Sequence, residues 1–547
     1  MSETEEFYEV DQVLRLLGNP GRFQIIQFLV LAYQYIPLAM NDFMPIFYGL
    51  PPLSVRCVGD PTRNSTDSMI TESNQTKAVC SCPNGYIYEY PGKQWSIIAD
   101  MNLICDKAAL VNLASVIYFL GQMLSTPLFG WSADKFGRRP TLLLSNLLYT
   151  ILTIGLVFSR DYTSFVLLRF FVGVARQGMN SSFFILLMEW TPPDRRGTWA
   201  ALAELSYTFG VLLITLVAFL LQNWRHIQAF LAAATVLSIP IFWFAPESLT
   251  WLCLHSHSDQ VLINCKTVAK FNSIVLDGPT NDRIRRFAEK AESAETTRAY
   301  SFLDCFRTPN IRRTTMLCCF SWLACYFGYL GSSYLSSEIA SDVYLNLAIN
   351  GLVEFIPILG AYGVASRFGN KLPLVVYFLI GGVCSVVAGA IPGRTYTELV
   401  AQNIMAVIGR MFFVGTCCVI FVFTSELFPT VIRNNGFSLC SIALRIGCVI
   451  APLLPLMSPA TGVKGSGFLL VGIVGIIAAG SSALLRETKG KPLPDTIQDA
   501  EKLGAADSMK LPDGLRLRRF AIRKSLAAPV PIPVIVTIPT PDRRRVD

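Results

Sequence analysis

Twelve apolar segments dominate this sequence, and they limit its folding more than any other feature. A helix of roughly 20 apolar residues crosses the hydrocarbon core of a bilayer. Lipid cannot hydrogen-bond an open backbone, so such segments must be helices unless they close into a barrel. We therefore predict an all-α membrane protein with twelve transmembrane helices. The segments lie at about 25–48, 108–131, 141–158, 163–187, 198–221, 227–245, 315–335, 343–365, 372–391, 399–423, 437–457 and 467–485.

The low charge content agrees with this prediction. Asp, Glu, Lys and Arg make up 15% of the 547 residues, against about 25% in soluble domains. The net charge of +8 comes from Lys and Arg between and after the apolar segments. The tendency of cytoplasmic loops to be basic explains that placement better than a nucleic-acid partner does. We expect a lipid bilayer around the chain and no nucleic acid.

A long interruption at 49–107 has the marks of an extracellular loop. It contains two N-glycosylation sequons, which begin at Asn64 and Asn74. Sequons and paired cysteines belong to the oxidising side of a membrane. Four cysteines allow three pairings, and the sequence does not choose among them. The cysteines that we expect in disulfides are Cys57, Cys80, Cys82 and Cys105.

With this loop outside, an even number of spans puts both termini in the cytoplasm. A second, charged interruption at 249–312 then lies inside as well. The tail is basic and rich in proline, which is typical of disorder. The predicted order is a cytoplasmic N-terminus (1–22), an N-terminal six-helix bundle (23–248), a cytoplasmic linker (249–312), a C-terminal six-helix bundle (313–490) and a disordered cytoplasmic tail (491–547).

Three short motifs occur once in each half of the chain. The segment from Asp134 returns at Ser366, Glu189 returns at Glu426, and Glu247 returns at Glu487. The offsets are 366−134 = 232, 426−189 = 237 and 487−247 = 240. Three matches in order at nearly one offset indicate a duplicated six-helix unit. In transporters built from such parallel repeats the substrate site lies between the two halves.

These motifs also carry a family resemblance. Gly130-Trp-Ser-Ala-Asp134-Lys-Phe-Gly137-Arg138-Arg139 is similar to the signature between helices 2 and 3 of the major facilitator superfamily. The segments Gln94–Cys105, Pro246–Trp251 and Ser425–Arg433 resemble solute carrier family 22, the organic cation, organic anion and carnitine transporters. The resemblance covers about residues 8–495. It implies alternating-access transport of small organic ions and no enzyme activity. Ser366 in place of a second Asp, and the few loop cysteines, depart from the family pattern.

Two ionisable residues lie near the middle of predicted spans. Glu354 is about eleven residues into one span and Arg445 about nine residues into another, so both lie roughly 14–16 Å deep. Charges at that depth are costly unless they are paired or hydrated, and they mark functional sites. The two either pair with each other or line the central cavity. The resemblance implies a zwitterion site, with an ammonium at Glu354 and a carboxylate at Arg445.

Further cavity candidates follow from charge, aromaticity and spacing. Arg176 would supply selectivity for anions, whereas Arg169 is expected to tie helices together. Trp322, Tyr326 and Tyr329 are four and three residues apart, so they share one helix face. Aromatic faces attract cations. Ordinary helix packing is the alternative for each aromatic, and interhelical bonding for each polar residue. The remaining candidates are Trp322, Tyr326, Tyr329, Tyr207, Gln34 and Asn41.

Charged residues at matching points of both halves predict a cytoplasmic gate. Opposite charges at helix ends that pair in one state and separate in the other form the two-state element that alternating access requires. The alternative is a set of solvated charges that only determine topology, which does not explain the acids. The predicted gate residues are Asp134, Arg138, Arg139, Glu189, Arg195, Arg196, Glu247, Glu426, Arg433 and Glu487.

Together these patterns predict a plasma-membrane carrier of organic cations and carnitine-like zwitterions. An organic anion transporter or exchanger is the first alternative, and a non-transporting receptor that retains the fold is the second. The sequence holds no phosphate-binding glycine loop for ATP. Its three histidines form no convincing metal site, so we expect no cofactor and no metal. If an ion is co-transported, sodium or a proton is the candidate; exchange and facilitated diffusion fit the same motifs.

Overall fold

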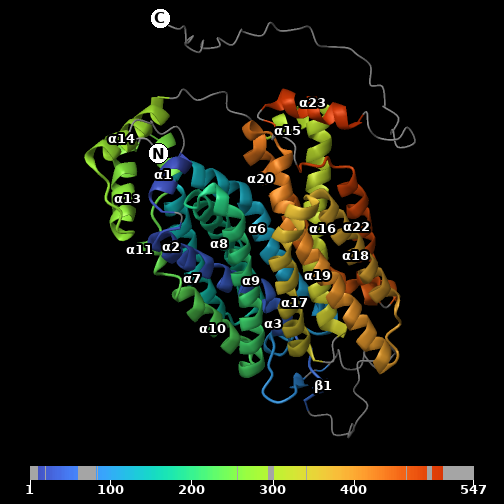
Figure 1. Cartoon of the computed structure of the whole chain (residues 1–547). Coiled ribbons are helices and arrows are strands. Elements are labelled where there is room, and N and C mark those ends of the chain that lie inside the picture. The colour runs from blue at the N-terminus through green and yellow to red at the C-terminus, as the bar shows by residue number, and fades with distance from the viewer. Residues whose placement is uncertain are drawn as a thin grey trace, which may run out of the picture.

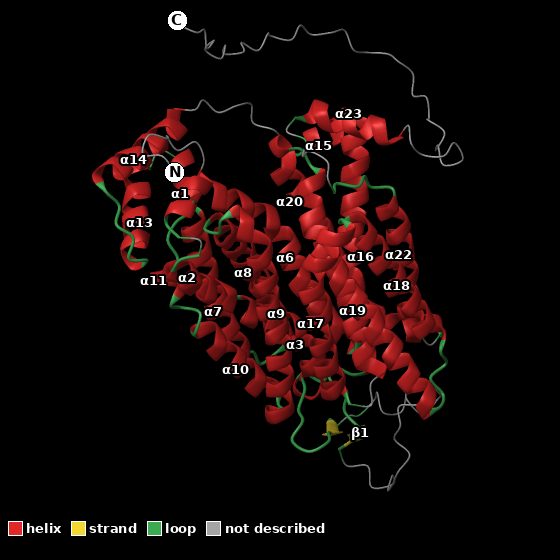
Figure 2. Cartoon of the chain, viewed as in Figure 1, coloured by secondary structure: helices red, strands yellow, loops and turns green. Residues whose placement is uncertain are grey.

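The computed structural model shows two helical bundles side by side (Figure 1). It describes residues 10–18, 20–58, 82, 84–255, 257–293, 301–339, 342–463, 465–489, 494 and 496–508. Helices account for nearly all of the regular structure (Figure 2). The short strand β1 and the linker helices lie at opposite ends of the molecule. The all-α prediction is confirmed.

The N-terminal bundle begins with a span in two pieces. α2 and α3 meet at Gln34 because Pro37, in the first turn of α3, has no N–H to donate to the end of α2. The helices of this bundle are α2 (Arg22–Tyr33), α3 (Tyr35–Tyr48), α6 (Ala109–Phe136), α7 (Arg138–Val157), α8 (Tyr162–Glu189), α9 (Pro193–Leu221), α10 (Trp224–Val236) and α11 (Ile241–Phe244).

The C-terminal bundle repeats this arrangement. The turn after its second long helix has a glycine with positive φ, as in the first bundle: φ is 106° at Gly137 and 82° at Gly369. The helices are α16 (Pro309–Ile339), α17 (Val343–Phe368), α18 (Lys371–Ala390), α19 (Tyr396–Leu427), α20 (Arg433–Ile450), α21 (Met457–Thr461) and α22 (Ser466–Ala483), with the 3-10 helices η2 (Thr430–Ile432) and η3 (Ala451–Leu456).

Ten helices of the described chain are long and apolar enough to cross a membrane. The other two predicted spans correspond to α8, which carries Arg169 and Arg176, and to α10 with α11. α10 is short because the chain turns before Pro240. The two halves contact each other along α9 with α17 and along α6 with α20.

A small ordered unit lies at the β1 end. β1 (Ser54–Cys57) pairs antiparallel with β2 (Tyr86–Glu89), and α5 (Ile97–Asp100) and η1 (Cys105–Lys107) follow. Cys57 and Cys82 form a disulfide, and Cys105 is disulfide-bonded as well. Asp100 accepts hydrogen bonds from Trp224 at 2.8 Å and Arg225 at 3.0 Å, which ties the unit to α10. Cys80, Asn64 and Asn74 lie outside the described residues.

Short helices cover the opposite end. They are α1 (Val10–Leu16), α12 (Leu249–Leu254), α13 (Ser258–Phe271), α14 (Gly278–Ser293), α15 (Asp304–Arg307) and α23 (Ile497–Ser508). The prediction of disorder from residue 491 onward is wrong for α23. This helix packs on α16, where Glu501 accepts the backbone N–H groups of Asn310 and Ile311. A carboxylate there satisfies free donors at the start of a helix.

The contact between α6 and α8 generates a stability prediction. A Cβ atom at Gly173 would lie 2.1 Å from the carbonyl oxygen of Tyr118, so Gly173→Ala must push the two helices apart. We expect a loss of about 1–3 kcal/mol and a lower melting temperature for the detergent-purified protein. Gly130→Ala is the control, because its Cβ would meet nothing within 4 Å. Equal melting temperatures for both variants would contradict this packing.

Candidate functional site

Two buried ion pairs lie in the membrane-spanning core, one in each half. Arg176 of α8 pairs with Asp42 of α3, and Arg410 of α19 pairs with Glu354 of α17. All four side chains are at most 5% exposed. An unpaired charge at such a place costs several kcal/mol. The pairs therefore hold together the helices that carry them.

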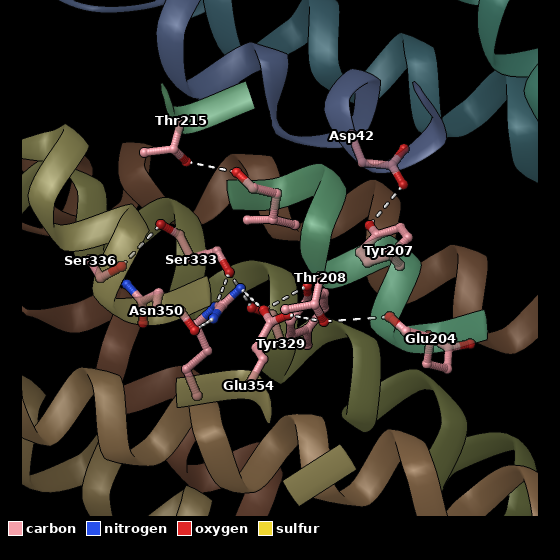
Figure 3. A network of polar contacts seen from close by, with 12 residues as sticks. Asp42, Glu204, Tyr207, Thr208, Thr215, Tyr329, Ser333, Ser336, Asn350 and Glu354 are labelled. Carbon is pink, nitrogen blue, oxygen red and sulfur yellow. Dashed lines mark hydrogen bonds and ion pairs between the residues drawn. The ribbon is translucent and has the colours of Figure 1, made fainter. Parts of the chain in front are cut away.

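Hydroxyl groups complete the hydrogen bonding of both carboxylates. Asp42 accepts from Tyr118 at 2.7 Å and from Tyr207 at 3.0 Å. Glu354 accepts from Thr208 at 2.9 Å and from Tyr329 at 3.1 Å (Figure 3). Thr208 belongs to α9, so the Thr208–Glu354 bond joins the two halves.

Each guanidinium nitrogen of Arg410 has a hydrogen-bond partner as well. It donates to Ser333 Oγ at 2.6 Å and to the carbonyl oxygen of Asn350 at 3.1 Å, in addition to its contact with Glu354. Sequence reasoning missed both Asp42 and Arg410. The repeat points to Arg410, because Arg410 follows Arg176 by 410−176 = 234 residues. This offset lies between the values of 232 and 240 found for the repeated motifs. Asp42 carried no such signal.

The predicted alternative in which Glu354 and Arg445 pair with each other is wrong. Glu354 is held by Arg410, whereas Arg445 donates Nη1 to Gln122 Oε1 at 2.7 Å. This bond joins α20 to α6 and so also connects the two halves. Arg445 is buried, its Nε has no hydrogen-bond partner, and it forms no ion pair within the described part of the chain. The core thus contains a guanidinium without a counter-ion.

The other predicted cavity residues divide into two groups. Tyr207, Tyr326 and Tyr329 surround the ion pairs: the rings of Tyr326 and Tyr329 are 6.2 Å apart, and Tyr329 also lies 4.8 Å from the Arg410 guanidinium. Trp322, by contrast, donates to Thr424 at 2.8 Å within its own half. Substrate contact stays a prediction for all of them.

Gln34 and Asn41 connect helices of the N-terminal bundle. Gln34 accepts from Asn146 at 3.0 Å. Asn41 donates to Tyr149 at 2.7 Å and accepts from Arg169 at 3.0 Å. Their amides are therefore engaged by the protein itself, and their substrate contact also stays a prediction.

The predicted gate charges are bonded within their own halves. Arg138 pairs with Asp134 at 3.2 Å and with Glu189 at 3.4 Å, and Glu247 accepts the backbone N–H of Arg139 at 3.1 Å. Arg196 pairs with Asp11 at 2.8 Å.

The C-terminal half shows the same local bonding. Glu426 accepts from Asn370 at 2.8 Å and from Thr488 at 2.5 Å, Glu487 accepts the backbone N–H of Thr488 at 3.0 Å, and Arg433 contacts Thr430 at 3.5 Å. The side chain of Arg195 lies outside the described part. Pairing of these charges across the two halves stays a prediction.

Aromatic contacts join the halves toward the β1 end. Phe47 of α3 stacks on Tyr344 of α17 at 5.9 Å, and Phe219 of α9 meets the same tyrosine at 5.8 Å. Phe43 lies 6.2 Å from Tyr329. The helix ends beside β1 and β2 are thus held together by apolar contacts.

Comparison with known proteins agrees with the fold and with the predicted family. Residues 64–498 match the family described as "Sugar (and other) transporter". The chain is 30% identical to mouse solute carrier family 22 member 12 over 81% of this chain and 79% of that protein. It is 27% identical to the Drosophila melanogaster organic cation transporter-like protein (90% of this chain, 93% of that one) and 26% identical to the Drosophila melanogaster β-alanine transporter (90% and 82%).

A solved structure supports the same architecture. The proton:xylose symporter XylE, bound to 6-bromo-6-deoxy-D-glucose, superimposes with a TM-score of 0.59 and 18% identity. The match covers 88% of this chain and 99% of the other. At this identity the likeness establishes the fold alone.

The buried pair in the C-terminal half generates a second prediction. Arg410→Ala would leave Glu354 buried without its cation, and we expect a loss of about 3–5 kcal/mol. The melting temperature of the purified protein and the fraction that elutes as a single species would both fall. The double variant Glu354→Gln with Arg410→Met removes both charges and should recover part of that loss. A double variant no more stable than Arg410→Ala would argue against the ion pair.

Proposed function

The chain belongs to solute carrier family 22, within the sugar (and other) transporters of the major facilitator superfamily, and on this premise we propose which organic ions it carries. It is a secondary transporter of organic ions and not an enzyme. Our proposal is that its substrate carries a carboxylate, which binds to Arg445 between the two halves.

One observation carries this proposal: Arg445 is a buried guanidinium that has no ion-pair partner among the residues that the structure describes. Its Nε–H is unused, and Nη1 meets only the neutral amide of Gln122. A substrate carboxylate would offset the charge and accept two parallel hydrogen bonds from the guanidinium. Organic anions and zwitterions both provide this group, whereas a simple organic cation does not.

The state of Glu354 supports this preference. A cation that binds Glu354 would have to displace Arg410, which lies on the same carboxylate and is itself bonded to Ser333 and Asn350. A carboxylate at Arg445 has only a neutral amide to displace. Since one relative is named a β-alanine transporter, and β-alanine has one ammonium and one carboxylate, a zwitterion fits the proposal.

We further propose alternating access between the two halves. The aromatic contacts near the extracellular loop and the local bonding of the gate charges correspond to a state closed to the outside. In the opposite state the gate charges would pair across the halves. Both termini would be cytoplasmic in the plasma membrane, and sodium or a proton would be the coupled ion.

Uptake measurements test the role of Arg445. In cells that express the chain, Arg445→Ala should reduce uptake of labelled carnitine or para-aminohippurate at least tenfold, because a charge-assisted hydrogen bond to the substrate is worth about 1.5–3 kcal/mol. Arg445→Lys should retain part of the uptake. Arg160→Ala, an exposed arginine, is the control at matched surface expression. Normal carboxylate uptake by Arg445→Ala, or uptake of tetraethylammonium alone by the unaltered chain, would overturn the proposal.

A gel-shift experiment tests the topology. If the loop at 49–107 is extracellular, peptide N-glycosidase should increase the mobility of the native protein. The double variant Asn64→Gln with Asn74→Gln should run at the deglycosylated position and lose the shift. Surface biotinylation locates the protein in the plasma membrane. A native protein that reaches the surface without any shift would contradict glycosylation at these sequons.

A further inference from the structure

A third acid, Glu204, lies in the core without an arginine partner. It belongs to α9, one helical turn before Thr208 and close to Tyr207 (Figure 3). Its Oε1 accepts a hydrogen bond from the Tyr35 hydroxyl at 3.2 Å, and the side chain is half-buried. Within the described residues it forms no ion pair. This distinguishes it from Asp42 and Glu354.

Glu204 lies where both halves converge. Tyr35 of α3 donates to it, and one turn further along α9 Thr208 donates to Glu354 of α17 in the other half. The arginines of the two buried ion pairs already have acidic partners, because Arg176 is bound to Asp42 and Arg410 to Glu354.

Two tyrosines lie beside the helices that carry Glu204 and Arg445. Tyr35 of the N-terminal half donates to Glu204 at 3.2 Å. Tyr326 of the C-terminal half lies on the turn of α16 against which Gly447 of α20, two residues after Arg445, is packed. An acid and a base, neither of which has an ion-pair partner among the described residues, therefore lie on helices that pack beside these two tyrosines. The acid is on α9 in the first half and the base on α20 in the second.

We propose that Glu204 binds the ammonium group of a zwitterionic substrate whose carboxylate is held by Arg445. This inference rests on the proposed role of Arg445 and adds the second pole of the site. A zwitterion compensates both charges at once, which neither a simple anion nor a simple cation does. The rings of Tyr35 and Tyr326 suit the ammonium as well, since aromatic faces attract cations. Glu354 stays in its ion pair and leaves the ammonium to Glu204.

The test compares two labelled substrates in Glu204→Gln, which keeps the shape of the side chain and removes its charge. Carnitine has a carboxylate and an ammonium, whereas para-aminohippurate has a carboxylate alone. We expect the KM for carnitine to rise at least tenfold. The KM for para-aminohippurate should stay or fall, because a repelling charge has been removed. Asp282→Asn, on the exposed face of α14, is the matched control at equal surface expression.

A second variant distinguishes an effect on binding from misfolding of Glu204→Gln. Tyr35→Phe keeps the ring but removes the only hydrogen bond that the structure gives the Glu204 carboxylate. It should change the KM for carnitine and leave that for para-aminohippurate unaltered. Equal effects of Glu204→Gln on both substrates, or no effect on either, would overturn the inference and leave Glu204 as a protonated structural acid.

The two proposals fail in different ways. If Arg445→Ala still takes up both substrates, the proposed function is wrong whatever Glu204 does. If Arg445→Ala abolishes uptake of both substrates while Glu204→Gln fails to discriminate between them, only the inference on Glu204 is wrong. Transport of para-aminohippurate but no zwitterion by the unaltered chain would also overturn it.

Discussion

The architecture depends on how the membrane-spanning core compensates its buried charges. Arg176 and Arg410 occupy the same position in the two halves: each is fourteen residues beyond the first residue of its helix, 176−162 and 410−396. Each arginine holds an acid from another helix of its own half. Because leaving a buried charge unpaired costs several kcal/mol, each pair holds its bundle together as one unit. Rigid bundles are what a rocking movement between two halves requires.

The repeat also relates the polar bonds that cross between the halves. Gln122 and Glu354 correspond at an offset of 354−122 = 232, and Thr208 and Arg445 at 445−208 = 237. The structure joins Thr208 to Glu354 and Arg445 to Gln122. Both bonds thus lie at equivalent positions, but the charges differ: one bond pairs a hydroxyl with an acid, the other an arginine with an amide. The two halves thus keep equivalent helix positions but place different charges at them. As a result Arg445 has no ion-pair partner among the described residues.

Sequence predicted the parts of this protein that depend on periodicity and depth. Long apolar segments give the spans, and a rise of about 1.5 Å per residue places Glu354 and Arg445 near the midplane. Depth does not give the direction in which a side chain points around its helix, so the sequence left open whether Glu354 and Arg445 pair with each other. The repeat offset predicts Arg410 as the counterpart of Arg176 in the second half. Asp42 and Glu204 each lie only six residues from one end of a predicted span (48−42 and 204−198), so the depth criterion did not select them.

The proposed site links substrate binding to movement through a single guanidinium. Arg445 donates Nη1 to Gln122 across the two halves, and a substrate carboxylate would compete for the same donor. A hydrogen bond to a charged group is worth about 1.5–3 kcal/mol, so the exchange of an amide for a carboxylate strengthens the hold on the substrate and weakens a bond between the halves. Glu354 has a different place in this scheme, because it keeps Arg410 whether or not its bond to Thr208 persists. Of the two bonds between the halves, the bond between Arg445 and Gln122 would therefore respond to the substrate. Glu354, the acid in the other bond, is paired with Arg410 of its own half.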